Sequence, residues 1–453
     1  FSSDDATAVG FISVRNLLDG GATAEILSAN VTGGSITIDA DNEAQLTATI
    51  DAEASASGGG TFGSGTQLAV NGVIASNTAL GGARAEAAQS TLTAETGDVS
   101  VTASNQIGLT AENNNQVSSG DQGVGAMLAF NTLGYEAQNI LFQTLDALLG
   151  TEIGDADAAK AEAFLTNTNV TAAGDVTVNA ENAATLSAVF DNSLESSASG
   201  FTGQSSMAAS AVIASNFMAS GAEAAIRGVG MDVTVDAGGA VSVTAGDQST
   251  LDSATTVSLL SETVSDNSFT ADDSMALGAV IVRNVLEGGV TAEIRNAGVT
   301  GASITIEAGN EAELDAVIEA EASASGGSTL GSGTQLAANG VIASNTALGG
   351  VRAEAAESTL TADTGDVSVT AANQIVLNAA NNNQVESGDQ GIGAMLAFNT
   401  LGYESQNVLF QTLDALIGSE IGNADPAKAE AFITNTNVTA EGGVTVAAEN
   451  AAT

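Results

Sequence analysis

The sequence predicts an all-β protein, a parallel β-solenoid with one short helical insertion in each 268-residue unit. Three observations predict it: the sequence repeats at a fixed offset, a strand-like motif recurs inside the repeat, and the composition suits a thin, regular core. Hydrophobic residues make up 44% of the chain but aromatic residues only 3%. Small and β-branched side chains favour short strands in closely stacked coils.

The long repeat has an offset of 268 residues and contains no insertion or deletion. It carries Phe1 to Phe269 and Arg15 to Arg283. We therefore expect residues 1–268 to form one complete solenoid super-repeat and residues 269–453 to form part of a second. No capping segment closes the second unit, so the chain is expected to be a piece of a longer array.

The strand-like motif recurs four times per unit. Its copies begin at Ile36, Val99, Val176 and Val241, and the next unit starts again at Ile304, which gives steps of 63, 77, 65 and 63 residues. Apolar and polar residues alternate within each copy, as in a strand with one buried face. With roughly 20 residues per coil, each quarter-unit makes about three coils, and the unit rises about 60 Å at ~4.8 Å per coil.

The longest step contains an insertion at about residues 133–160, which is copied at about 401–428. Leu141, Leu145 and Leu148 follow the i, i+4, i+7 spacing of a helix face, so a helix is predicted from about Tyr135 to Leu149. Two interpretations of this leucine stripe stay open: it packs on its own solenoid, or it makes a lateral contact with a neighbouring filament or subunit. Its copies in the second unit are Leu409, Leu413 and Leu416.

The composition excludes several kinds of chemistry. The chain has no cysteine and no histidine, which excludes disulfides, thiolate nucleophiles, Ser-His-Asp triads and ordinary zinc sites. With 8 basic and 54 acidic residues the net charge is -46, which argues against nucleic acids and anionic membranes as partners. No apolar run is long enough to predict a transmembrane segment. Since Arg15, Arg84 and Arg227 fall in separate quarter-units, no cluster of base, acid and arginine is expected.

Two groups of acids are candidate cation sites. The first group occupies matching places upstream of the motif, and it forms either a cation-binding stripe or, as we favour, a solvated strand face: Glu25, Glu86, Glu162 and Glu223. The second group follows the predicted helix and offers the oxygen ligands that Ca²⁺ prefers: Glu152, Asp155 and Asp157, with Glu420, Asn423 and Asp425 in the second unit. Loop solvation and helix capping are the alternative, because EF-hand spacing is absent. Calcium is the one candidate cofactor.

Uncharged polar residues also recur in register. Apolar strands end in asparagine at Asn77 and Asn216, and more loosely at Asn16 and Asn131. The run Asn113-Asn114-Asn115, copied at Asn381-Asn382-Asn383, forms either stacked amide ladders at a coil corner or plain turns. Hydroxyl positions such as Thr37 and Ser100 form either a flat array that binds ice or glycans, or simply the outer face of a strand.

The segment GAVIVRNVLEGGVTAEIRNAGVTGASITIEA, which begins at Gly278, resembles the repeats of very large secreted bacterial surface proteins. These are the filamentous-haemagglutinin-like adhesins and related giant autotransported proteins. The resemblance covers nearly the whole chain apart from the insertion. It implies a right-handed parallel β-helix, display outside the cell or on its surface, and a role in adhesion or scaffolding.

We therefore expect a non-catalytic, extracellular structural solenoid that forms part of a filament, surface fibre or adhesin stalk and has copies of itself as partners. The first alternative is an adhesin region that binds glycans or surfaces. Only two tyrosines are present, Tyr135 and Tyr403, which disfavours stacking of sugars on aromatic side chains. The second alternative is a carbohydrate-active β-helix enzyme that uses paired carboxylates.

Overall fold

The computed structural model describes residues 5–57, 66–137, 154–156, 158–200, 205–265, 273–326, 333–405, 422–424 and 427–453. All regular elements in these ranges are strands, β1 to β35, and none is a helix. Nearly all pairings are parallel, which confirms the predicted all-β, parallel-sheet character. The described residues include no helix long and apolar enough to cross a membrane.

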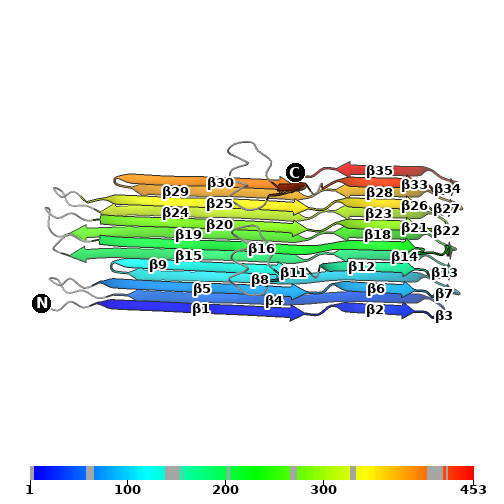
Figure 1. The fold of residues 1–453 in the computed structure, drawn as a ribbon, viewed down its shortest axis with the longest axis horizontal. Helices are drawn as coiled ribbons and strands as arrows, with labels where there is room; N and C mark the ends of the chain where they lie inside the picture. The colour runs from blue at the N-terminus through cyan, green and yellow to red at the C-terminus, as the bar shows by residue number, and fades with distance from the viewer. Residues whose placement is uncertain are drawn as a thin grey trace.

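The chain repeats one circuit that passes through three sheets, and successive circuits stack on one another (Figure 1). Each circuit runs along the long arm of a 13-stranded sheet, bends into the short arm of that sheet, crosses a 7-stranded sheet, and returns along an 11-stranded sheet. Strand β16 (Ser205–Arg227) runs through both arms without interruption and so joins them. This arrangement is consistent with a β-solenoid.

The long arm consists of β16 together with β1 (Ala6–Asp19), β5 (Gln67–Leu80), β9 (Gln122–Leu133), β20 (Asp273–Glu287), β25 (Gln335–Leu348) and β30 (Gln390–Leu401). The short arm consists of β16 together with β2 (Ala22–Leu27), β6 (Ala83–Ala88), β12 (Ala159–Thr166), β21 (Val290–Arg295), β26 (Val351–Ala356) and β33 (Ala429–Thr434).

The 7-stranded sheet consists of β3 (Asn30–Gly33), β7 (Thr91–Ala94), β13 (Asn169–Ala172), β17 (Val233–Ala237), β22 (Ala297–Gly301), β27 (Thr359–Ala362) and β34 (Asn437–Ala440). The 11-stranded sheet consists of β4 (Ile36–Ala56), β8 (Val99–Ser119), β14 (Val176–Asn182), β15 (Thr185–Gly200), β18 (Val241–Asp247), β19 (Thr250–Ser265), β23 (Ile304–Asn310), β24 (Glu313–Gly326), β28 (Val367–Asn373), β29 (Val376–Ser387) and β35 (Val444–Asn450).

The recurring motif lies in register in the 11-stranded sheet. Ile36 pairs with Val99, Val99 with Val176, Val176 with Val241, and Val241 with Ile304. One quarter of the 268-residue unit is therefore one circuit, and the expectation of about three short coils per quarter is wrong. The strands are much longer than the motif within them: β4 and β8 each contain 21 residues.

The dimensions change accordingly. Four circuits at ~4.8 Å each give the 268-residue unit a rise of about 19 Å, in place of about 60 Å. A 21-residue strand extends about 70 Å at ~3.3 Å per residue. The molecule is therefore longest along its strands and short along the stacking direction (Figure 1).

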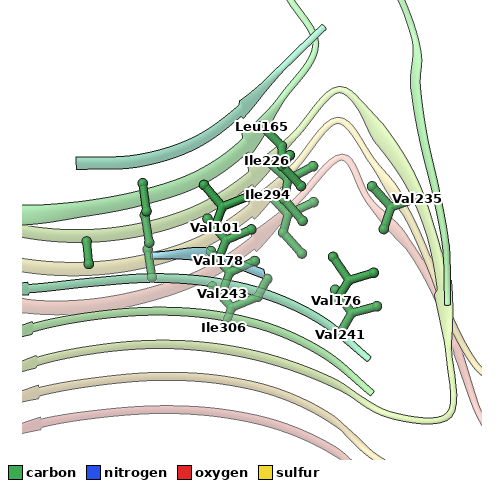
Figure 2. Close-up of a cluster of buried hydrophobic side chains, with 14 of the residues drawn as sticks. Val101, Leu165, Val176, Val178, Ile226, Val235, Val241, Val243, Ile294 and Ile306 are labelled. Carbon is green, nitrogen blue, oxygen red and sulfur yellow. The ribbon is translucent and has the colours of Figure 1, made fainter. Parts of the chain in front are cut away.

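The core is a thin layer between facing sheets. Side chains in β4 alternate strictly between buried and exposed over its first and last thirds, and every buried position there is Ile or Ala. At the short-arm end, Val178, Val243 and Ile306 of the 11-stranded sheet face Leu165, Ile226 and Ile294 of the short arm (Figure 2). Each of these six side chains is fully buried. Small alanines let the facing sheets approach closely elsewhere.

The insertion does not begin as the predicted helix. Tyr135–Ala137 forms β10, which pairs antiparallel with β11 (Gly154–Ala156), and β31 (Tyr403–Ser405) pairs in the same way with β32 (Gly422–Ala424). The start of the helix at Tyr135 is therefore wrong, because this residue enters a hairpin and its ring lies 5.2 Å from that of Phe217. Residues 138–153 and 406–421, with the stripes Leu141/Leu145/Leu148 and Leu409/Leu413/Leu416, lie outside the described residues.

Candidate functional site

An asparagine ladder crosses all seven strands of the long arm, and its five inner members are fully buried. The Nδ2 group of each asparagine donates to the Oδ1 atom of the next at 2.8–3.0 Å, in the order Asn16, Asn77, Asn131, Asn216, Asn284, Asn345 and Asn399. The second Nδ2 proton reaches a backbone carbonyl of the facing 11-stranded sheet, as from Asn131 to Ser187 at 2.7 Å. The ladder therefore joins neighbouring circuits and also fastens the two sheets together. It contains all four strand-ending asparagines singled out in the sequence.

The predicted amide ladders at the asparagine runs are found in part. Asn71 donates to Asn115, and Asn115 donates to Asn192, at 2.7 and 3.1 Å. Asn383 accepts from Asn339 at 3.0 Å in the second unit. These residues lie inside long strands and not at a coil corner, which corrects that part of the prediction.

A further ladder contains a buried acid. Asn42 donates to Asn105, Asn105 to Asn182, and Asn182 to Asp247, at 2.9, 2.9 and 3.1 Å. Asp247 is 1% exposed and stands where neighbouring circuits have asparagine. Burial raises the pKa of its carboxyl group, and hydrogen bonds from Ser249 and Asn182 only partly oppose that shift.

The outer face of the short arm carries a network of arginines and glutamates. Arg84 contacts Glu86 at 2.7 Å and Glu162 at 2.6 Å, and lies 4.0 Å from Glu25, so it bridges three circuits. Arg84 and Arg227 also stack on the ring of Phe164, at 4.9 and 4.2 Å from its centroid. The sequence analysis expected no cluster because the arginines fall in separate quarter-units. Residues about 61–78 positions apart in fact lie on adjacent circuits, so arginines and acids of different quarter-units meet.

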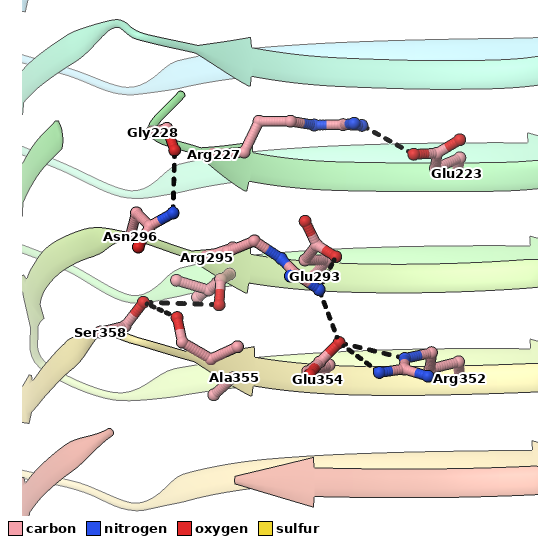
Figure 3. Close-up of polar contacts among 12 residues, drawn as sticks. Glu223, Arg227, Gly228, Glu293, Arg295, Asn296, Arg352, Glu354, Ala355 and Ser358 are labelled. Carbon is pink, nitrogen blue, oxygen red and sulfur yellow. Dashed lines mark hydrogen bonds and ion pairs between the residues drawn. The ribbon is translucent and has the colours of Figure 1, made fainter. Parts of the chain in front are cut away.

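The same network continues in the later circuits. Arg227 pairs with Glu223, and Glu354 receives both Arg295 and Arg352, at 3.0 and 2.7 Å (Figure 3). The four acids proposed as one stripe form two rows: Glu25 pairs with Glu86, and Glu162 pairs with Glu223. Each of these acids has an arginine within 4.0 Å.

Two equivalent hollows lie where the long arm bends into the short arm. The first, of about 410 Å³, is lined by Arg84, Lys160 and Glu162 together with the glycines of the bend. The second, of about 320 Å³, is lined by Arg352, Lys428 and Glu430, which stand 268 positions later. Basic and acidic groups therefore do gather in one place, contrary to the expectation from the sequence.

The candidate calcium ligands are not brought together by any described contact. Glu152, Asp157, Glu420 and Asp425 lie outside the described residues. Asp155 and Asn423 are placed only as backbone positions in β11 and β32. Among the residues that the structure places, no group of three or more acids is arranged to hold a metal ion. The calcium site stays a prediction.

The hydroxyl positions form one continuous row on the outer face of the 11-stranded sheet. The row runs through Thr37, Ser100, Thr177, Ser242, Thr305, Ser368 and Thr445. The neighbouring row includes acids, Asp39 and Glu307 among them, so the hydroxyl row is not part of a flat, uncharged array.

Three neighbouring rows on the outer face of the long arm are apolar over six strands, which the sequence analysis missed, although the next row contains Arg15 and Arg283. Its rim row is Val70, Val124, Ala209, Leu277, Ala338 and Ile392; its floor row is Gly72, Ala126, Ala211, Ala279, Gly340 and Ala394; its ridge row is Ile74, Leu128, Ile213, Ile281, Ile342 and Leu396. A groove of about 530 Å³ runs over the rim and floor rows from β9 to β30. No titratable side chain lines it.

A signal for this face exists in the sequence. Strands with one wet face alternate, as β4 does, whereas strands covered on both faces read as continuous apolar runs. Strands β25 (QLAANGVIASNTAL) and β20 (DSMALGAVIVRNVLE) are closer to the second kind, because apolar residues follow one another in GVIA and GAVIV.

No family model, curated protein or solved structure matches the chain.

Proposed function

We propose that this chain is a stretch of an extracellular, right-handed parallel β-helix that acts as a mechanical element of a filament, surface fibre or adhesin stalk and has no catalytic activity. The observation that carries the proposal is the in-register pairing of successive circuits, with an asparagine ladder running through every strand of the long arm. Each circuit is thereby bonded to the next by its backbone and by buried amides. Such an array gains stability circuit by circuit.

The right-handed sense rests on a general rule. Connections between parallel strands of one sheet are right-handed in about 98% of cases, because of the twist of the strands. Each circuit of this chain is such a connection between neighbouring parallel strands. Display outside the cell rests on the resemblance of the repeats to those of secreted surface proteins.

Cryo-electron microscopy tests this structural role. In native material we expect continuous fibres with a ~4.8 Å spacing between strands and a super-period of about 19 Å along the fibre axis. Compact particles without an axial period, or a left-handed winding, would contradict the proposal. Turnover of any sugar in a glycan panel would contradict the absence of catalysis.

A second candidate function is glycan binding, favoured by the two repeated hollows. Each combines an arginine and a lysine with at least one acid, Glu162 or Glu430 among them, so it offers donors and acceptors to the hydroxyl groups of a sugar. A glycan array with acidic and neutral sugars tests it. We expect binding of a sugar that a Lys160→Ala/Lys428→Ala variant loses; equal binding by that variant would exclude the hollows.

A further inference from the structure

We propose that the outer face of the long arm is a lateral interface on which a second copy of this chain docks, sheet against sheet. The proposal rests on the structural role above and names the contact between neighbouring filaments. The face is built from the rim, floor and ridge rows of β5, β9, β16, β20, β25 and β30, which lie side by side (Figure 1). Large apolar faces of this kind mark interaction sites.

The charge distribution favours a second copy of the chain as the partner that binds this face. The chain has a net charge of -46, so two copies repel each other wherever their acids meet. The outer face of the 11-stranded sheet is acidic, with Asp51 and Glu53 of β4 followed in a later circuit by Glu319 and Glu321 of β24. The rim, floor and ridge rows contain no charged residue. Two copies can therefore approach closely through this face without opposing their charges.

The shape of the face is self-complementary. Small floor residues such as Ala211 and Ala279 are exposed between the rim and the ridge, which carry bulkier side chains such as Leu277 and Ile281. In a twofold arrangement the ridge of one copy lies over the floor of the other, and both surfaces share the ~4.8 Å strand spacing. Packing of this kind places the two sheets ~10 Å apart, as in a β-sandwich.

The size of the face suits a small dimer interface. Six strands at ~4.8 Å and the five residues from rim to ridge at ~3.3 Å give a footprint of about 475 Å² on each copy. Two such faces bury about 950 Å² in total, which is near the lower limit for a specific interface. The face is therefore a continuous patch that suits a weak dimer, and not a set of scattered exposed aliphatics.

Sedimentation velocity with matched lysine variants tests the interface. We expect the unaltered chain to sediment as a dimer of 44.3 kDa subunits and the Ile213→Lys/Ile281→Lys/Ile342→Lys variant as a monomer. The control is Val189→Lys/Leu260→Lys/Val317→Lys, which alters three half-buried aliphatic residues on the outer face of the 11-stranded sheet. Both variants change the net charge equally, so loss of the dimer in the first alone assigns the interface. A monomeric unaltered chain, or a dimer that survives the ridge lysines, overturns the proposal.

Cysteine cross-linking gives a second test, which does not depend on the folding of a triple variant. The chain has no cysteine, so a single introduced thiol is unambiguous. With a short bis-maleimide, Ala211→Cys in the middle strand of the long arm should give a cross-linked dimer, and Thr256→Cys on the opposite face of the same circuit should not. Equal cross-linking of both variants overturns the proposal. So does a monomer that binds phosphatidylcholine vesicles through this face. Open-ended oligomers that the ridge lysines leave unchanged would indicate stacking end to end, which contradicts the lateral interface while leaving the structural role intact.

Discussion

At the scale of single residues, the molecule depends on buried polar side chains that recur once per circuit. A lone amide in an apolar layer costs free energy unless its donors and acceptor are satisfied. Here the fixed spacing of parallel strands solves the problem, because each amide finds the equivalent amide of the next circuit. A defect in one circuit therefore affects both neighbours.

Removal of one amide should reveal this coupling. Asn131→Ala takes the acceptor from Asn77 and the donor from Asn216, and it frees the carbonyl of Ser187. We expect the free energy of unfolding to fall by about 2–3 kcal/mol, since several buried polar atoms lose their partners together. The control is Asn114→Ala at an exposed position of β8, which should change it by less than about 0.5 kcal/mol. Chemical denaturation compares the two; equal effects would mean that the ladder adds no stability.

The acid in the second ladder should make stability depend on pH. The folded state raises the pKa of Asp247 above 3.8, so between the two pKa values the folded state binds more protons than the unfolded state. The contribution of Asp247 to stability is therefore greatest below about pH 3.8 and is lost as pH rises through the folded pKa.

Asp247→Asn should consequently stabilise the protein at neutral pH, by about 1–3 kcal/mol, the scale of a buried polar mismatch. An asparagine here restores the donor that the other members of the ladder have. Its advantage over the unaltered chain should shrink as the pH is lowered to about 3.8. Asp236→Asn, at an exposed position, removes the same charge and serves as the control. Thermal melts from pH 3.5 to 7.5 measure the difference, and a constant difference would contradict a buried ionising Asp247.

At the scale of elements, the bend between the two arms depends on glycine. Gly81 has a φ of +82°, and a Cβ there would lie 2.6 Å from the carbonyl oxygen of Gly20 in the preceding circuit. Gly81→Ala should therefore cost at least about 1–2 kcal/mol, the penalty for a left-handed backbone alone. Gly20→Ala at the same bend meets no atom within 4 Å and should be neutral or slightly stabilising. Similar melting temperatures for the two variants would show that the bend adapts.

The sequence predicts the features of these elements that depend on neighbouring residues, and it misses those that depend on residues far apart in the chain. The strand motif and the asparagines are predicted because alternation and recurrence are local signals. The length of a circuit is not predicted, because turn residues follow every strand and do not indicate which strands pair with each other. The arginine network escaped notice for the same reason, since Arg84 and Glu162 are 78 residues apart. The start of the insertion was misread as helix because local spacing could not reveal the packing of Tyr135 on Phe217.

At the scale of the whole molecule, the two outer faces differ in charge. On the outer face of the 11-stranded sheet, Asp252 pairs with Asp315 of the neighbouring strand, and burial together with repulsion from Asp315 and Glu313 raises the pKa of Asp252. The long arm places aliphatic residues on its outer face instead. The acidic face thus keeps copies apart, whereas the rim, floor and ridge rows of the long arm offer an uncharged surface for the proposed contact.

This charge distribution predicts how salt affects stability. Like charges stacked on one face destabilise the folded state, and ions screen that repulsion. We therefore expect the melting temperature to rise between about 10 mM and 300 mM NaCl, by a few degrees, and to rise further at lower concentrations of MgCl₂. CaCl₂ at the same concentration should match MgCl₂ if screening is the only effect, because both ions carry the same charge. A larger rise in CaCl₂ would contradict simple screening and would support a coordinating site that prefers the larger ion. Glu152, Asp155 and Asp157 would then be the first acids to replace with their amides, with Asp51→Asn on the exposed face of β4 as the control.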